Sequence, residues 1–422
     1  MDLTVLTVLI FLLVYLVMGL GRFPGLKVDR TGAAVIGTFA MLVAGSIGAK
    51  AAWDAVDYRT IGLLFGLMVV SGAFAVSGFY AFAARRVALL PISPPALLAV
   101  LVVVSGLLSS VLTNDVVVVA MTPLLVSLTL ARGFNPVPFL LAFCFAANTG
   151  AAGVLIGSPQ NMIAANSLGL SFNGFLLAAG LPALLSLPIV WGVVAFLYRG
   201  AWTLPKAIGK ETAPTAPAAE SEGHPFDLLE TVKATLVAVV VVIAFVVDIW
   251  PRELVALGAA GVLLVNRKIA SNDVLKQVDG NLLLLIMGLF VINAALAATG
   301  LPKVLLDELR HTGLDLNDPL SLFFVSAVLS NIVGNSPTVM LLAPYLQPGG
   351  DAAALGAALA LGTGFSSNLI VFGSLAGIIV VEQAAACGIR ISFATFAKAG
   401  VPVALLCAAM AALWIAMQQA AI

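Results

Sequence analysis

Hydrophobic runs of about 20 residues alternate with short polar segments along nearly the whole chain. Runs of this length are typical of helices that cross a lipid bilayer. In the first half the candidate spans cover residues 3–20, 32–49, 60–82, 93–131, 136–168 and 173–198. In the second half they cover residues 229–249, 252–266, 279–300, 319–346, 352–385 and 394–418. The pattern therefore predicts an all-α polytopic membrane protein.

Four of these runs contain polar interruptions. Thr113-Asn114-Asp115, the first tip, interrupts 93–131, and Gly334-Asn335-Ser336, the second tip, interrupts 319–346. Residues 148–161, the first break, and 362–377, the second break, are rich in Gly, Ser and Asn. We interpret the two tips as the turns of re-entrant hairpins and the two breaks as unwound helices. Unpaired backbone groups in hydrocarbon cost several kcal/mol each, so we expect the four interruptions to meet at one polar site.

The interruptions belong to an internal repeat. The aligned pairs are Asn114 with Asn335 and Pro123 with Pro344 at an offset of 221, Asp57 with Asp279 and Gly66 with Gly288 at 222, and Gly157 with Gly373 and Ser158 with Ser374 at 216. Paired interruptions of this kind are typical of secondary transporters that bind their substrate between two repeats. We predict a first repeat at 1–199, a Pro-, Ala- and charge-rich linker at 200–227, and a second repeat at 228–422.

The arrangement of basic residues predicts the orientation in the membrane. If neither hairpin crosses, each half has five spans, and this odd number inverts the second half relative to the first. One side then holds 13 basic residues: Arg22, Lys27, Arg30, Arg85, Arg86, Arg132, Arg199, Lys206, Lys210, Arg267, Lys268, Lys276 and Arg390. The side of the termini holds five: Lys50, Arg59, Arg252, Lys303 and Arg310. The positive-inside rule places the linker in the cytoplasm and both termini outside.

Composition narrows the class of protein. With 61% hydrophobic and 9% charged residues and a mean hydropathy of +1.13, the chain is suited to a bilayer. Its 20 basic and 20 acidic residues form no run that suggests a nucleic-acid partner. We find no zinc-protease motif and no phosphate-binding loop, and the three cysteines form no metal pair. We therefore expect no enzyme, no cofactor and no metal. A channel would also use polar pore residues, but two inverted hairpins favour alternating access.

The interruptions supply neutral donors and acceptors for a bound solute. The candidate substrate-binding residues are Thr113, Asn114, Asn148, Thr149, Ser158, Asn335, Ser336, Thr338, Ser366, Ser367 and Asn368. Asp115 is acidic and lies between two apolar arms, so we predict that it carries the coupling proton. Ser71 and Asn293 are isolated polar residues, which we interpret as helix-packing residues. Glu382 lies near a predicted span end, which favours an interfacial role.

These motifs carry a resemblance. The Asn-Asp turn followed by Thr-Pro, the IGSPQN and FGSLAG breaks and the Asn-Ser-Pro-Thr turn resemble the ion transporter superfamily, and within it the bacterial arsenite and antimonite efflux permeases. The resemblance covers essentially the whole chain. It implies ten spans in two inverted repeats, each with one re-entrant hairpin and one broken helix, and elevator-like movement in the bacterial inner membrane. It leaves open a homodimer and a separate ATPase subunit.

The tips also bear on the substrate. Related divalent anion/sodium symporters carry Ser-Asn-Thr at both tips, and this chain departs from that pattern. No basic residue lies in the four interruptions, although a multiply charged anion usually needs one. Arsenite near neutral pH is an uncharged trihydroxide. We therefore expect export of arsenite or antimonite in exchange for protons. The alternatives are sodium- or proton-coupled transport of dicarboxylates or another inorganic anion, and sodium/proton antiport.

Overall fold

The computed structural model describes residues 2–23, 25–203, 225–311, 313–347 and 351–420. Its described part is almost wholly helical. The helices of the first half are α1 (Leu3–Leu20), α2 (Arg30–Val43), α3 (Ala49–Ala55), α4 (Tyr58–Val76), α5 (Phe79–Ala88), α6 (Pro94–Val111), α7 (Asn114–Ala131), α8 (Pro136–Ala152), α9 (Pro159–Leu168) and α10 (Phe172–Leu197).

The second half has the same order of long helices. They are α11 (Leu228–Val247), α12 (Arg252–Leu264), α13 (Ser271–Leu275), α14 (Gly280–Ala298), α15 (Leu301–His311), α16 (Pro319–Val333), α17 (Asn335–Leu342), η1 (Ala343–Tyr345), α18 (Ala352–Ser366), η2 (Val371–Gly373), α19 (Leu375–Ala386) and α20 (Phe393–Ala420). Among the described residues, eight helices are long and apolar enough to cross a membrane. The predicted all-α polytopic fold is confirmed.

All four interruptions are present as breaks between helices. The first tip joins α6 to α7, and the second tip joins α16 to α17. The first break separates α8 from α9, where Ser158 is extended and Pro159 starts the new helix. Proline is favoured at the first helical position because its missing N–H would have no helical partner. The second break separates α18 from α19 in the same way, with Ser374 extended.

The two halves pack against each other reciprocally. A Cβ atom on Gly66 of α4 would lie 2.5 Å from the Ala256 carbonyl carbon of α12, and one on Gly288 of α14 would lie 3.0 Å from Ala34 Cβ of α2. Both glycines, and both alanines, are 222 residues apart, so the same close contact occurs twice. In both contacts, a helix of the first half packs against a helix of the second half. Whether the halves are inverted stays a prediction, and most of the predicted linker lies outside the described residues.

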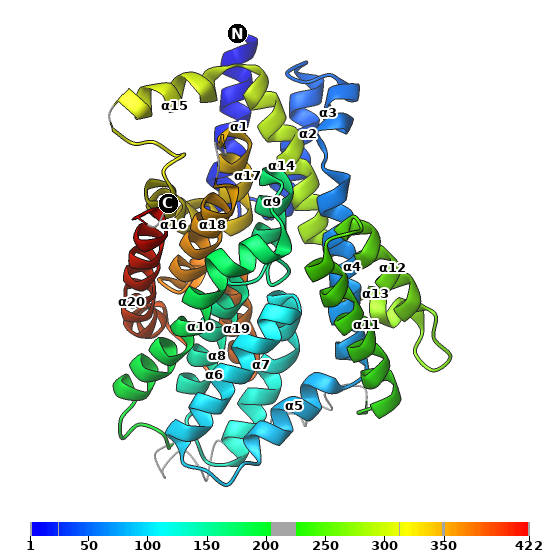
Figure 1. Ribbon diagram of the computed structural model, residues 1–422, viewed down its shortest axis with the longest axis vertical. Helices are drawn as coiled ribbons and strands as arrows, with labels where there is room; N and C mark the ends of the chain where they lie inside the picture. Colours follow the sequence, from blue (N-terminus) through cyan, green and yellow to red (C-terminus); the bar gives the residue numbers. More distant parts are fainter. Residues whose placement is uncertain (1, 24, 204–224, 312, 348–350, 421–422) are drawn as a thin grey trace.

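Two predicted spans differ from the observed helices. The span predicted for 60–82 ends at Val76, because Gly78 has a φ of +74° and turns the chain into the separate helix α5. Only glycine adopts this left-handed conformation at little cost. The span predicted for 32–49 ends at Val43 and is followed by the short helix α3. Figure 1 shows α3 and α15 at the end of the molecule that carries the N-terminus, and α5 at the opposite end.

Candidate functional site

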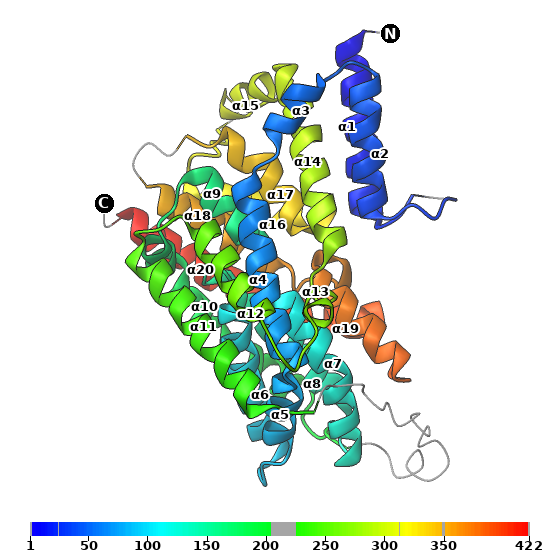
Figure 2. The same ribbon diagram turned by 90° about the vertical axis from the view of Figure 1, so that its right-hand side faces the viewer.

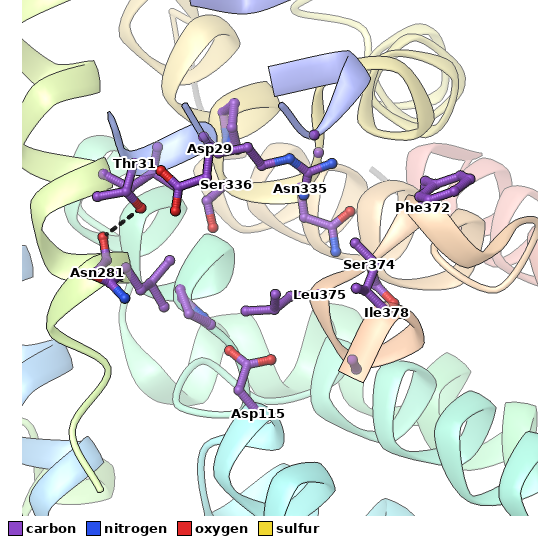
Figure 3. Close-up of a pocket in the computed structure, with 18 of the residues that line it drawn as sticks. Asp29, Thr31, Asp115, Asn281, Asn335, Ser336, Phe372, Ser374, Leu375 and Ile378 are labelled. Atoms are coloured by element: carbon purple, nitrogen blue, oxygen red, sulfur yellow. Dashed lines mark hydrogen bonds between the residues drawn. The ribbon is translucent and has the colours of Figure 1, made fainter. Parts of the chain in front are cut away.

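A cavity of about 740 Å³ lies between the two tips and the loop that joins α1 to α2. Figure 2 shows α1 and α2 side by side at one edge of the molecule. The polar lining comes from the four interruptions, the α1–α2 loop with the start of α2, the start of α14, and α19: Arg22, Asp29, Arg30, Thr31, Asn114, Asp115, Gln160, Asp279, Asn281, Asn335, Ser336, Ser374 and Glu382. Figure 3 shows Asp115, Ser336, Asn335 and Ser374 around the same space.

The first tip is fixed by its backbone. The Asn114 N–H donates to the Gly157 carbonyl oxygen at 3.1 Å, which joins the tip to the first break. The Thr113 N–H donates to Ser71 Oγ of α4 at 3.0 Å. These bonds occupy backbone groups that have no partner at the start of a helix. Asn114 lines the cavity, and its buried Oδ1 has no partner among the described residues.

The second tip is fixed by a side chain. Gly334 has a φ of +97°, the left-handed region that favours glycine, and this turns α16 into α17. Asn335 Nδ2 donates to Ser367 Oγ at 2.8 Å, and that hydroxyl donates in turn to the Thr363 carbonyl. Because Ser367 uses its proton on Thr363, it must accept from Asn335, which fixes the amide orientation. Asn335 Oδ1 is then left without a partner in the described part of the chain.

Behind the cavity, the two breaks are joined to each other. Asn148 Nδ2 of the first break donates to Asn368 Oδ1 at 2.9 Å and to Ser374 Oγ at 3.1 Å, both in the second break. Asn368 Nδ2 donates back to the Phe145 carbonyl at 3.3 Å. All of these groups are buried, where satisfied polar networks make a structure rigid. The bonds connect the halves and brace the wall that carries Ser374.

The predicted site residues divide into two groups. Asn114, Asp115, Asn335 and Ser336 line the cavity. The others are buried outside its lining: Thr113, Asn148, Thr149, Ser158, Thr338, Ser366, Ser367 and Asn368. Several of the second group hold the tips and breaks in place, as Ser367 holds Asn335. Their roles in binding and coupling stay predictions.

The cavity is also lined by charged residues that the sequence analysis did not predict to lie there. Arg22, Asp29 and Arg30 lie in or beside the α1–α2 loop, which Arg22 and Asp29 close by a β-bridge. Arg30 Nε donates to the Met18 carbonyl at 2.9 Å. The four interruptions carry no basic residue, but the α1–α2 region adds these two arginines to the cavity. They come from a loop that folds back toward the cavity, a tertiary contact with no motif to indicate it.

Acidic residues outnumber these arginines. Asp29, Asp115, Asp279 and Glu382 all line the cavity. Asp279 accepts from the Leu282 N–H and caps α14. Glu382 lies in α19 and lines the cavity, and its interfacial role stays a prediction. With every group ionised, four carboxylates face two guanidinium groups, which leaves an excess of negative charge.

The all-helical membrane fold and the polar cavity among its broken helices define a secondary transporter. The chain belongs to the citrate transporter family CitMHS, whose sequence profile matches residues 9–362. It is 31% identical to an uncharacterized transporter of Mycobacterium tuberculosis over 98% of both chains. It is also 36% identical to the silicon efflux transporter of Oryza sativa subsp. japonica, over 39% of this chain and 33% of that protein.

A solved structure shows the same fold. The YdaH transporter of Alcanivorax borkumensis matches 98% of this chain and 98% of its own, with a TM-score of 0.56 and 16% sequence identity. The match extends over both halves of the chain. At this identity, it supports the arrangement of helices and carries no argument about the substrate.

Proposed function

We propose that this protein exports a neutral trivalent metalloid hydroxide, arsenite or antimonite, in exchange for protons. The observation that carries the proposal is the pair of unpartnered oxygens at the tips, Asn114 Oδ1 and Asn335 Oδ1, among the described residues. Both residues line the cavity. Each oxygen needs a hydrogen-bond donor, and leaving it without one when it is buried is costly. A trihydroxide supplies three O–H donors, whereas a carboxylate supplies only acceptors.

The charge of the cavity supports the same class of substrate. Its carboxylates outnumber its guanidinium groups, so a dicarboxylate or tricarboxylate anion would meet net repulsion. An uncharged hydroxide meets no such repulsion and loses less hydration on entering the site. The likeness to a silicon efflux transporter agrees with export of a small inorganic solute.

Coupling to protons is assigned to Asp115. This residue follows Asn114 at the start of α7, and Figure 3 shows its carboxylate in the cavity with Leu375 between it and Ser374. A carboxyl group in a poorly solvated site can load and release a proton near neutral pH. We propose that the tips and breaks move together against α2, α4, α12 and α14, and expose Asp115 to each side in turn.

Expression in an arsenite-sensitive bacterial strain tests the substrate. We expect restored growth on arsenite and a lower arsenic content of the cells. Asn335→Ala should abolish this rescue because it removes both the free oxygen and the bond to Ser367. Asn173→Ala is the matched control, since Asn173 is exposed and bonds only the Val246 carbonyl. Unchanged sensitivity with a well-expressed, membrane-inserted protein would refute arsenite export.

A second candidate function is coupled transport of a carboxylate anion. It is favoured by Arg22 and Arg30 in the cavity and by the family's description as citrate transporters. Proteoliposomes with imposed pH or sodium gradients distinguish the two, with arsenite, antimonite, succinate and citrate offered separately. Sodium-driven succinate or citrate uptake without arsenite flux would assign the protein to this second class.

A further inference from the structure

Ser71 and Asn293 occupy equivalent positions in the two halves, 222 residues apart on α4 and α14. Ser71 is buried and its Oγ accepts from the N–H of Thr113 in the first tip. Asn293 has no such bond to the second tip. Its Oδ1 accepts from the Tyr15 hydroxyl at 2.9 Å, and its Nδ2 is shielded from solvent without a partner among the described residues. Ser71 therefore bonds its tip, whereas Asn293 bonds Tyr15 and keeps an unpaired amide nitrogen among the described residues.

The second tip lies at a distance from Asn293 along α14. A Cβ atom on Gly19 would lie 2.8 Å from the Ile332 carbonyl oxygen, so the chain just before the second tip contacts α1 one turn beyond Tyr15. The tip lines the cavity together with Leu285, eight residues before Asn293. At a rise of 1.5 Å per residue, eight residues correspond to about 12 Å. A shift of this order along α14 separates the cavity wall at Leu285 from Asn293.

We propose that Ser71 and Asn293 are alternating latches for the two tips. In the present state, Ser71 holds the first tip, and Tyr15 holds Asn293. In the opposite state, Thr113 leaves Ser71, and Asn293 Nδ2 donates to a backbone carbonyl of the second tip near Gly334. Both are positioning residues that set the balance between the two states. The proposal rests on the movement described under the proposed function, and it is independent of the identity of the substrate.

The physical basis is the cost of an unpaired buried polar group. The amide nitrogen of Asn293 lacks a partner now, and a carbonyl of the arriving tip would supply one. The Thr113 N–H, buried against Ser71, would lose its partner in the same step. In each state one of these two groups is paired and the other is unpaired, so the two costs offset each other. Neither state is then penalised twice, which suits a carrier that must populate both.

Labelling from the two membrane faces tests the latches. We start from a variant with Cys144, Cys387 and Cys407 replaced by alanine and place a reporter cysteine in the cavity by Ser336→Cys. Oriented membrane vesicles of both polarities are treated with a membrane-impermeant maleimide, without substrate. The ratio of the two labelling rates reports which side the cavity faces, and the faster side in the parent marks the present state.

We expect Ser71→Ala to shift the ratio away from the present state by about two- to tenfold, the effect of one net hydrogen bond. Tyr15→Phe should shift it the same way, because it removes the bond that holds Asn293. Asn293→Leu, compared in the Tyr15→Phe background so that the Tyr15 bond is absent from both proteins, should shift the ratio toward the present state, because it removes the latch of the other state and the unpartnered amide of this one. Ser326→Ala is the control, because that hydroxyl bonds only within its own helix.

Conservative variants separate a latch from a packing role. Ser71→Thr keeps a hydroxyl and should keep the parent ratio, as should Asn293→Gln, which keeps an amide donor. Opposite shifts for Ser71→Ala and Asn293→Leu support the latches. Shifts in the same direction, or an unchanged ratio in both, overturn them. Labelling from one face alone in every variant would instead refute alternating access, which distinguishes failure of the latches from failure of the proposed movement.

Discussion

At the scale of single residues, the two tip asparagines line the cavity and are held in place by different means. Asn335 is oriented by its own side-chain bond to Ser367, whereas Asn114 is placed by its backbone bond to Gly157. Both leave an Oδ1 without a partner in the described structure. Such convergence favours a solute that donates hydrogen bonds to both tips. Under the proposed function, Asp115 beside Asn114 carries the exchanged proton.

Asp115→Asn should abolish accumulation driven by a pH gradient and leave folding intact. The amide keeps the shape of the carboxyl group but cannot titrate, so downhill exchange of arsenite can persist while coupling is lost. Uptake into everted vesicles, with and without an imposed pH gradient, measures the two separately. Asp248→Asn is the matched control, because Asp248 pairs with Arg252 away from the cavity. Full gradient-driven uptake by Asp115→Asn would transfer coupling to Glu382 or to sodium.

At the scale of helices, the two breaks have the same backbone conformation at equivalent positions. Ser158 and Ser374 have nearly the same backbone angles, φ −154° and ψ 152° against φ −144° and ψ 153°. A Cβ on Gly157 would lie 2.5 Å from the Ala151 carbonyl oxygen, and one on Gly373 would lie 3.1 Å from the Ser367 carbonyl oxygen. The close backbone approach explains why both turns carry glycine.

The contact between α4 and α12 gives a prediction about stability. Gly66→Ala places a methyl group against the backbone of Ala256, and overpacking of this kind costs about 1–3 kcal/mol. Thermal unfolding of purified protein in detergent should show a lower Tm. Gly258→Ala on α12 is the control, because a Cβ there meets no atom within 4 Å and alanine favours the helix. A Tm for Gly66→Ala at or above that of the parent would contradict the close packing.

At the scale of the whole molecule, the sequence predicted most of the fold but only part of the cavity. Helix lengths, tips and breaks follow from local chemistry, namely apolar runs interrupted by Gly, Asn and Pro. The α1–α2 loop is different, because Arg30 reaches the cavity only through the way the loop closes and contacts α1. Ser71 likewise looked like a packing residue, since its partner Thr113 is 42 residues away. Contacts of this range depend on the assembled fold.

The distribution of basic residues predicts which end of the molecule faces the cytoplasm. The α7–α8 loop at the base of the first hairpin and the start of the predicted linker lie together, because the Asn135 N–H donates to the Trp202 carbonyl at 2.8 Å. The excess of basic residues near these segments predicts that this side is cytoplasmic. Ala201→Cys and Ala51→Cys, each in the variant without native cysteines, should report opposite faces, since both positions are exposed.

In intact cells, an impermeant maleimide should label Ala51→Cys on α3 and should label Ala201→Cys only after permeabilisation. Figure 1 places α3 at the end that carries the N-terminus, so labelling there would also put the N-terminus outside. Labelling of Ala201→Cys without permeabilisation would reverse the orientation. The first hairpin would then enter from outside, and the direction of the proposed metalloid export would have to be reassigned together with it.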